Sequence, residues 1–265
     1  MSTALTAADY ERLAQEYLAQ LPPEHFMEGT PHAKQREITV ESFAVYRTRR
    51  PDLQYFNELL VQYFFRGNLR QVVPDNSAIL TDAPEQARTS YVIEHEPVPL
   101  FLVMEYVSAS NKRKDYVVVD NFHKYERELK VPYYLIFDPE EQDLQVYRHG
   151  GEVYTRMEPD AAGRCLIAEL DLQAGILDRW VRFWHQGVLL ELPAELQASL
   201  DRLARRVGEL ESTLLQQQEQ MRQMVETLRA AVSVRAAQLE RQDVLDRLPR
   251  ATDWISLQHL WLELG

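Results

Sequence analysis

Two acidic residues far apart in the chain, Glu105 and Asp75, are the side chains best suited to chemistry. Glu105 lies inside the apolar run Leu100–Val107. A carboxylate in such a strand is costly to bury unless it is paired, hydrogen-bonded or bound to a metal ion. Asp75 follows Val72-Val73-Pro74, at the start or bend of another candidate strand. If the two strands are neighbours, both carboxylates point into one cleft at a sheet edge.

Carboxylate oxygens in one cleft suit a hard cation such as Mg²⁺ or Mn²⁺, with the carbonyl of Tyr106 and water completing the ligand shell. A bound divalent ion activates water and stabilises the charge of a phosphodiester transition state. A structural interpretation stands beside this one. A strand glutamate can form a salt bridge or end its strand, and Pro74-Asp75 is an ordinary turn pair.

The elements that must position these acids are strands joined by a helix. The polar stretch Asp115–Lys130 lies between two apolar runs, which predicts a βαβ unit with parallel strands buried on both faces. A hairpin is expected after it, turning at His149-Gly150-Gly151. The strand candidates are Val72-Val73, Ala78–Leu80, Leu100–Val107, Tyr133–Phe137, Leu144–Arg148 and Val153-Tyr154.

Helices are expected before and after these strands. Thr6–Leu21 is amphipathic and ends at Pro22-Pro23. Apolar residues at helical spacing predict a helix over Leu53–Phe64, closed by Gly67-Asn68. The segment Leu170–Trp184 is expected to cap the domain, with Trp180 and Trp184 on one helical face.

A heptad pattern follows Pro193. It predicts a helix for self-association, in which the polar Gln217 sets the register and Arg235 marks fraying; one long helix folded back on the domain is the alternative. The tail Val244–Leu264 is expected to form a small cap. The apolar seam residues are Leu200, Leu203, Val207, Leu210, Leu214, Met221, Met224 and Leu228.

Composition excludes several classes of protein. The net charge of -12 argues against a surface coated for nucleic acid, although it allows a local basic strip. Cys165 is the only cysteine, which excludes a disulfide framework or a cysteine zinc site within one chain. Signal-peptide, membrane-span, P-loop and GxGxxG patterns are not found, so we expect a cytoplasmic protein without a membrane segment or nucleotide cofactor.

Several ordered motifs resemble a known family. They are Pro74-Asp75, then Leu102–Ser108 with Glu105 inside it, then Asp115, Tyr125 and Val131–Pro139. This order resembles the Uma-two-type family of restriction endonucleases, a bacterial branch of the PD-(D/E)XK nuclease superfamily, over roughly residues 50 to 190.

The resemblance implies a fold class and a domain organisation. The fold is α/β: a restriction-endonuclease-like mixed sheet flanked by helices, followed by a long C-terminal coiled-coil helix. The expected parts are an N-terminal helical extension (1–50), a nuclease domain (51–192), a coiled-coil helix (193–241) and a C-terminal helical cap (242–265).

The resemblance also implies roles for individual residues. Asp75 and Glu105 match the metal-binding acids. The superfamily's lysine two residues after the acid is here Val107, and the family's lysine four residues before Tyr125 is here Asn121. Lys124, about one helical turn further on, is the proposed catalytic lysine, and Lys114 is another candidate; a solvated helix lysine is the alternative for Lys124.

Further residues have supporting roles in this interpretation. Asp115 is a helix cap or supports the metal ligands, and Glu58 is an additional acid on the preceding helix or a surface glutamate. The cluster Lys112-Arg113-Lys114 contacts a phosphate backbone or is a solvated loop.

The function predicted from these residues is a Mg²⁺-dependent endonuclease that hydrolyses DNA and dimerises through its C-terminal helix. The alternatives are a catalytically inactive nuclease scaffold serving as a coiled-coil interaction module, and a nucleic-acid binder that does not cleave.

Overall fold

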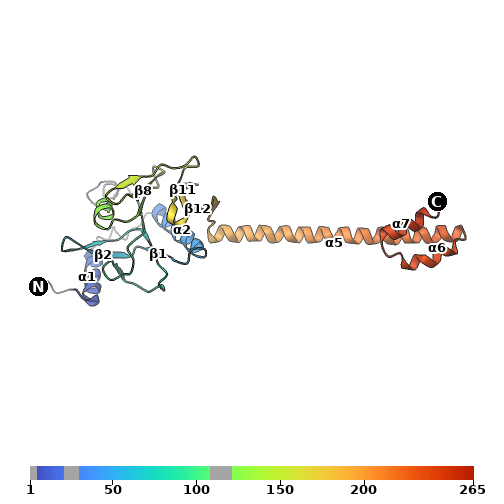
Figure 1. Ribbon diagram of the computed structural model, residues 1–265, viewed down its shortest axis with the longest axis horizontal. Coiled ribbons are helices and arrows are strands. Elements are labelled where there is room, and N and C mark those ends of the chain that lie inside the picture. Colours follow the sequence, from blue (N-terminus) through green and yellow to red (C-terminus); the bar gives the residue numbers. More distant parts are fainter. Residues whose placement is uncertain (1–4, 21–29, 108–120) are drawn as a thin grey trace. The chain divides into compact units, whose positions relative to one another are not determined.

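The computed structural model describes residues 5–20, 30–107 and 121–265. The chain divides into two units, Met1–Glu195 and Leu196–Gly265. The first unit is a mixed α/β domain with mixed sheets, and the second is built from helices around the long helix α5, Pro193–Gln238 (Figure 1). The predicted fold class is confirmed. None of the helices in the described ranges is long and apolar enough to cross a membrane.

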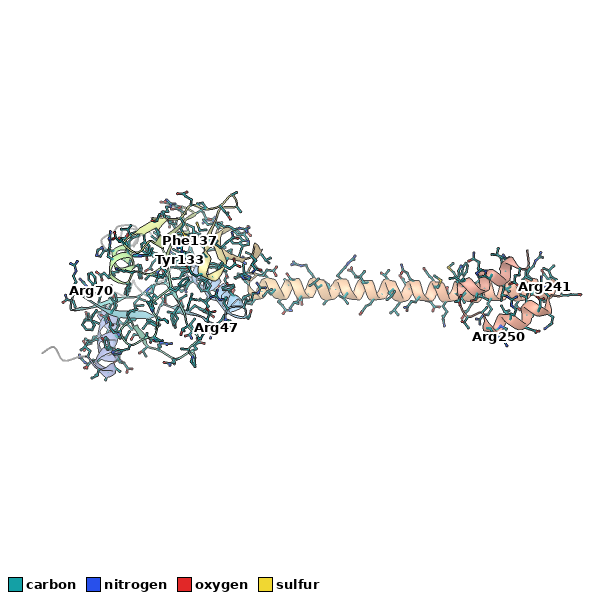
Figure 2. All side chains as sticks on the ribbon, viewed as in Figure 1. Arg47, Arg70, Tyr133, Phe137, Arg241 and Arg250 are labelled. Carbon is teal, nitrogen blue, oxygen red and sulfur yellow. The ribbon has the colours of Figure 1, made fainter. Side chains whose placement is uncertain are left out.

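The central sheet of the first unit carries the two apolar runs side by side. The strands β6 and β7 pair in parallel, as the βαβ pattern predicts, and every residue of both is buried. Tyr133 and Phe137 of β7 are labelled in Figure 2. The strand order is β1 (Leu53–Asn57), β4 (Asn76–Leu80), β6 (Leu102–Tyr106), β7 (Tyr133–Asp138), β8 (Asp143–His149) and β9 (Tyr154–Arg156).

Neighbours of β6 and β7 confirm two further expectations. The strand β4, which follows Asp75, pairs antiparallel with β6, so the two acid-bearing segments are adjacent. The strands β8 and β9 form the predicted hairpin at the sheet edge. The segment leading into β7 contains the short helix α4, Asn121–His123, which continues as the π-helical turn η2, Lys124–Glu128.

The helix predicted over Leu53–Phe64 is wrong. This segment forms β1 and then β2, Leu60–Phe65, with Glu58 in the left-handed region at the turn between them. Gly67 does not cap a helix; its positive φ of 80° lies in the hairpin turn between β2 and β3. Pairing with neighbouring strands and the aromatic content of the segment outweigh its helical spacing. The second sheet has the order β3 (Asn68–Val72), β2 and β5 (Ser90–Val92).

The helical face expected for Leu170–Trp184 is also wrong. The segment contains two antiparallel strands that turn at Asp178 and Arg179, both at positive φ. Residues four apart share a face in a strand as well as in a helix, so the spacing of Trp180 and Trp184 did not distinguish the two. The third sheet is β10 (Arg164–Ile167), β11 (Leu172–Leu177), β12 (Trp180–His185) and β13 (Val188–Leu189), with the short helix η3 (Ala168–Leu170) before β11.

Helix α2, Thr30–Arg47, joins the central sheet and the third sheet into one core. Phe43 and Tyr46 belong to the cluster that includes residues of β6, β7, β11 and β12. The buried Gln35 side chain accepts from the Val181 amide at 2.8 Å and donates to the Val181 carbonyl at 3.1 Å. These bonds satisfy the backbone of β12 and fix α2 beside it. Helix α1, Ala7–Gln20, lies near β2 and β5.

The second unit has its own core. The C-terminal part of α5 packs against α6 (Gln242–Arg247) and α7 (Trp254–Leu262), with the turn η4 (Leu248–Arg250) between them (Figure 1). Arg241 and Arg250, which flank α6 and η4, are labelled in Figure 2. Asp253 caps α7 by accepting from the Ser256 amide at 2.8 Å. The core consists of Val232, Ala236, Val244, Leu248, Ala251, Leu257, Leu260 and Leu264.

Candidate functional site

Asp75 lies directly before β4, and its carboxylate reaches the end of β6. The ladder between the strands ends with Asn76 opposite Met104. Asp75 itself lies in a bend, one residue beyond this ladder. The Asp75 Oδ2 atom accepts a hydrogen bond from the Tyr106 amide at 2.7 Å. The Asp75 carboxylate is therefore bonded to the backbone of the residue that follows Glu105, at the end of β6.

A buried arginine holds Asp75 from the other side. Arg36 of α2 is 8% exposed, and its Nη2 atom donates to Asp75 Oδ1 at 2.8 Å. Its Nη1 atom lies 2.9 Å from Glu58 Oε1. Glu58 was expected on a helix, but it lies in the β1–β2 turn and joins the acidic cluster through Arg36.

Glu105 is held by neutral donors. It is 5% exposed, and its Oε1 atom accepts from the Asn121 side-chain amide at 3.1 Å and from the Tyr125 hydroxyl at 2.7 Å. Both donors come from the segment formed by α4 and η2. Hydrogen bonds to a buried carboxylate stabilise its charge without cancelling it. Glu105 thus contributes a buried carboxylate, whereas the Asp75 carboxylate is paired with Arg36.

Tyr106 points toward α2, on the opposite face from Glu105, because successive strand residues alternate. Its hydroxyl donates to Asn76 Oδ1 at 2.6 Å and lies 2.8 Å from the Thr39 hydroxyl. Burial raises the pKa of this phenol, and the negative charges of Asp75 and Glu105 add to the effect. Tyr106 is therefore a neutral structural side chain, and only its backbone is available to the site.

The donor chemistry of the site fits a hard divalent cation. Three carboxylates (Asp75, Glu105 and Glu58) and one guanidinium (Arg36) give a formal charge of −2. Within the described residues, Asn121 Oδ1 is buried and has no hydrogen-bond partner, although its amide nitrogen binds Glu105. The three carboxylates and the Asn121 Oδ1 atom supply the candidate ligand atoms of the site. All these atoms are oxygens, which Mg²⁺ prefers.

No group of three or more histidine, cysteine, aspartate or glutamate side chains that could hold a metal ion occurs within residues 5–20, 30–107 and 121–265. The fit therefore depends on the two acids together with amide and backbone oxygens. Arg36 also occupies one oxygen of Asp75, so an ion at Asp75 must share this carboxylate with the guanidinium.

The other residues predicted from the sequence have different positions. Lys124 lies half-buried in η2, next to Tyr125. Asn121, which stands where the family's lysine is expected, contacts Glu105. The predicted basic cluster Lys112–Lys114 and Asp115 lie outside the residues that the structure describes.

Sequence reasoning did not find Arg36, Thr39 or Asn76, and it used Tyr125 only as a landmark. The helix that carries Arg36 and Thr39 has polar side chains on its buried face, so no apolar stripe indicated it. The spacing of four residues between Asn121 and Tyr125 did contain a signal, because such residues share one face of a helix.

Comparison with known proteins gives the relatives of this fold. A search of curated proteins found no match. Among solved structures, the chain is similar to a putative nuclease of the DUF820 group from Anabaena variabilis, with 19% sequence identity and a TM-score of 0.39. That similarity covers 54% of this chain and 75% of the other.

The family model Uma2, described as "Putative restriction endonuclease", matches residues 7–178 of the 265 residues. The match spans the first helix, the central sheet and both acids. It extends further toward the N-terminus than the motifs alone indicate, and it includes Arg36. On this match, which covers more than half of its length, the chain belongs to the Uma2 family of restriction-endonuclease-like proteins.

Proposed function

We propose that this protein is a divalent-metal-dependent endonuclease that hydrolyses DNA phosphodiester bonds at the site formed by Asp75 and Glu105. The observation that supports the proposal is the hydrogen bond from the Tyr106 amide to Asp75 Oδ2 at 2.7 Å, which brings the Asp75 carboxylate to the residue next to Glu105. Membership of the Uma2 family supports a nuclease as the general class.

In this proposal Asp75, Glu105 and the Tyr106 carbonyl hold Mg²⁺ or Mn²⁺, with Asn121 Oδ1 as a further oxygen donor. When bound, the ion supplies an activated water and neutralises charge on the phosphoryl group. The protein's own residues set the geometry. Tyr125 and Asn121 fix the rotamer of Glu105, and Arg36 holds Asp75 against the Tyr106 amide.

Positive charge for the phosphate comes from lysine and arginine side chains in this proposal. Lys124 positions the water or stabilises the developing charge. Lys112, Arg113 and Lys114 contact the phosphate backbone, and Asp115 supports the helix that follows them. The Arg36 guanidinium also forms an ion pair with Glu58, so Glu58 adds negative charge beside Asp75.

The test is cleavage of plasmid DNA with Mg²⁺ or Mn²⁺ by the purified chain and by Asp75→Ala and Glu105→Ala. We expect each variant to lose at least about 100-fold of the activity, since each removes a charge that the transition state needs. Glu128→Gln is a matched control. Glu128 also accepts from a tyrosine hydroxyl, that of Tyr63 at 2.7 Å, and Tyr63 belongs to β2 in the second sheet. Undiminished cleavage by both alanine variants refutes the proposal.

A catalytically inactive nuclease scaffold is the second candidate function. It is favoured by the ion pair that Arg36 makes with Asp75, and by Val107 and Asn121 at the two positions where lysine is usual. Calorimetric titration with Mg²⁺ separates the candidates, because a scaffold without a metal site shows no binding heat. If DNA binds without cleavage and its affinity falls steeply with salt, the protein is a nucleic-acid binder.

We also propose that the chain associates with itself through α5. The support is the apolar heptad seam on this helix, whose residues are exposed in the single chain. Sedimentation equilibrium of the full chain tests it. A monomer at all concentrations in the micromolar range contradicts it.

A further inference from the structure

The helix α5 has an uncovered apolar seam over its first part. The seam residues between Leu200 and Met224 are between 49% and 63% exposed, apart from the polar Gln217. Figure 2 shows side chains standing out from the ribbon all along α5. The seam alternates in steps of three and four residues, so it forms one stripe along a helix. These residues are Leu200, Leu203, Val207, Leu210, Leu214, Met221 and Met224.

The same helix is covered further along. Val232 and Ala236 are fully buried by the chain's own helices α6 and α7, and Val225 and Leu228 pack partly against that core. The open seam therefore ends at about Met224. What remains is about four heptads of apolar surface, a length that suits a coiled coil with a second helix.

The seam's polar residue restricts the partner. With Leu200 at position a of the heptad, Leu203 is at d, and Gln217 is also at d. In a parallel pair in register, d residues face d residues, so Gln217 meets its own copy and the two amides can hydrogen-bond. In an antiparallel pair d residues face a residues, which here are all apolar, so the amide is left without a partner.

The charged residues that flank the seam also favour a parallel partner helix. Among the positions e and g that border the seam from Leu196 to Met224, Arg206 (g) and Glu211 (e) are the charged residues. A parallel coiled coil pairs g with the e position five residues later in the partner, which brings Arg206 to Glu211 twice. An antiparallel coiled coil pairs g with g and e with e, which never joins these two residues.

Arg206 is free to make this contact. In the single chain it pairs with Glu209 at 3.0 Å, with both side chains about two-thirds exposed. An exposed pair between neighbouring turns contributes little to stability. Breaking the Arg206–Glu209 pair to form one across the seam therefore costs little free energy.

We propose that residues 196–224 form a parallel, in-register, two-stranded coiled coil with a second copy of this chain. The inference rests on the proposed self-association and adds its orientation. Each first unit ends at Glu195, immediately before the coil begins. A parallel coil therefore places both nuclease units at the same end, where two sites can act on the two strands of one duplex.

The test is disulfide cross-linking in the full chain. Cys165 is first replaced by serine, and single cysteines are introduced as Leu203→Cys and Met221→Cys, both in the seam and away from its centre. In the parallel arrangement Leu203→Cys cross-links to itself and not to Met221→Cys, because 18 helical residues separate them by about 27 Å. Circular dichroism verifies that both variants remain helical.

Each outcome decides the question. Self-linked Leu203→Cys on a non-reducing gel supports the parallel arrangement. Links only in the mixture of the two variants overturn it in favour of an antiparallel coil. A dimer in sedimentation without either link overturns the register, and a monomer overturns self-association itself. DNA cleavage is measured separately, so failure of the nuclease proposal is distinguishable.

Charge reversal gives an independent readout. Arg206→Glu and Glu211→Arg each place like charges across a parallel seam at both symmetric contacts, so each variant alone should dimerise at least about 5-fold more weakly. A mixture of the two variants places opposite charges at both contacts and should form heterodimers preferentially. Arg222→Glu, outside e and g, is the control. Unchanged homodimerisation of both variants contradicts the pairing.

Discussion

The two units of this chain differ in which side chains they bury and which they expose. The first unit buries charged groups, including Glu105 and Arg36. The second exposes a row of apolar side chains such as Leu203, which is 63% exposed. In soluble proteins both are unusual, because buried charge and exposed apolar stripes each carry a free-energy cost.

The two units differ in the interactions that offset these free-energy costs. Inside the first unit every buried charge discussed above has hydrogen bonds or an ion pair, and the remaining charge of −2 suits a divalent cation. Inside the second unit α6 and α7 cover the end of α5 but leave the seam open. The first unit thus pairs its buried charges within the fold, whereas the seam of α5 has no apolar cover from the described residues of the single chain.

The largest expected effect compares a buried position of α5, covered by α6 and α7, with an exposed position on the same helix. Val232→Asp places a carboxylate in a fully buried position without a partner, and should destabilise the C-terminal helices by about 3–5 kcal/mol. Val234→Asp is the control, since Val234 is on the same helix and exposed. Hydrogen exchange of residues 225–264 measures the effect. Equal protection in both variants would show that α6 and α7 do not cover α5.

The second prediction concerns the buried charge of the first unit. Arg36→Met leaves Asp75 and Glu58 without their cation, and should destabilise the fold by about 2–3 kcal/mol, discounted because Glu58 is half-exposed. Mg²⁺ should restore part of this loss, since an ion can take the place of the guanidinium.

Urea unfolding with and without Mg²⁺ makes the measurement for Arg36→Met. The control is Arg47→Met on the same helix, which pairs with the exposed Glu85 and should change stability by less than about 0.5 kcal/mol. A loss of stability that Mg²⁺ leaves unchanged would mean that the cluster does not bind the ion.

The third prediction tests the hydrogen bonds to Glu105 without changing those to Asp75. Tyr125→Phe removes the hydroxyl 2.7 Å from Glu105 and should cost about 1–2 kcal/mol of stability, because Asn121 still donates to the same oxygen. Cleavage should fall by about 10-fold, since a looser carboxylate positions its ligand less well. Tyr63→Phe, which loses a similar bond to Glu128, is the control and should keep its activity.

The strands that carry the site could be predicted because their residues form continuous apolar runs. Leu102–Tyr106 and Tyr133–Asp138 are buried on both faces, so no polar alternation hides them. Glu105 stood out for the same reason, as a charge inside such a run. Those runs also gave the parallel pairing and the position of Asp75 beside it.

Helix α2 could not be recognised from the same signal. Its buried face carries Gln35, Arg36, Thr39 and Ser42 next to Ile38 and Phe43, so the apolar stripe is interrupted. Three of these polar residues, Gln35, Arg36 and Thr39, bind groups that other elements supply, namely the Val181 backbone, Asp75 and the Tyr106 hydroxyl. Only the fold brings these groups together, and the site depends on them.

The error over Leu53–Phe64 has a related cause. Residues such as Leu53, Phe56 and Leu60 recur at helical spacing, yet Leu53 pairs with Leu80 on β4 and Leu60 pairs with Ser90 on β5. Strand formation here depends on partners 27 to 30 residues away, which a local pattern does not contain.

The smallest expected effect tests how α5 begins. Glu195, in its first turn, accepts from the Leu192 amide at 2.8 Å and from the buried Arg182 at 2.6 Å. The hydrogen bond from Arg182 holds the pKa of Glu195 below its ordinary value of 4.5. A lowered pKa means that the contribution to stability is present above pH 4.5 and is lost as the pH falls through the lowered value.

Glu195→Gln should therefore destabilise the chain by about 1 kcal/mol at neutral pH, discounted because the Glu195 side chain is partly exposed, and its effect should shrink as the pH is lowered from 7 to 3. Thermal unfolding at the two pH values is the measurement. Glu219→Gln is the matched control: an arginine also lowers the pKa of Glu219, but Arg222 is exposed and loses nothing by facing water. Equal behaviour of the two variants would mean that the burial of Arg182 does not matter, since that burial is what separates the two glutamates.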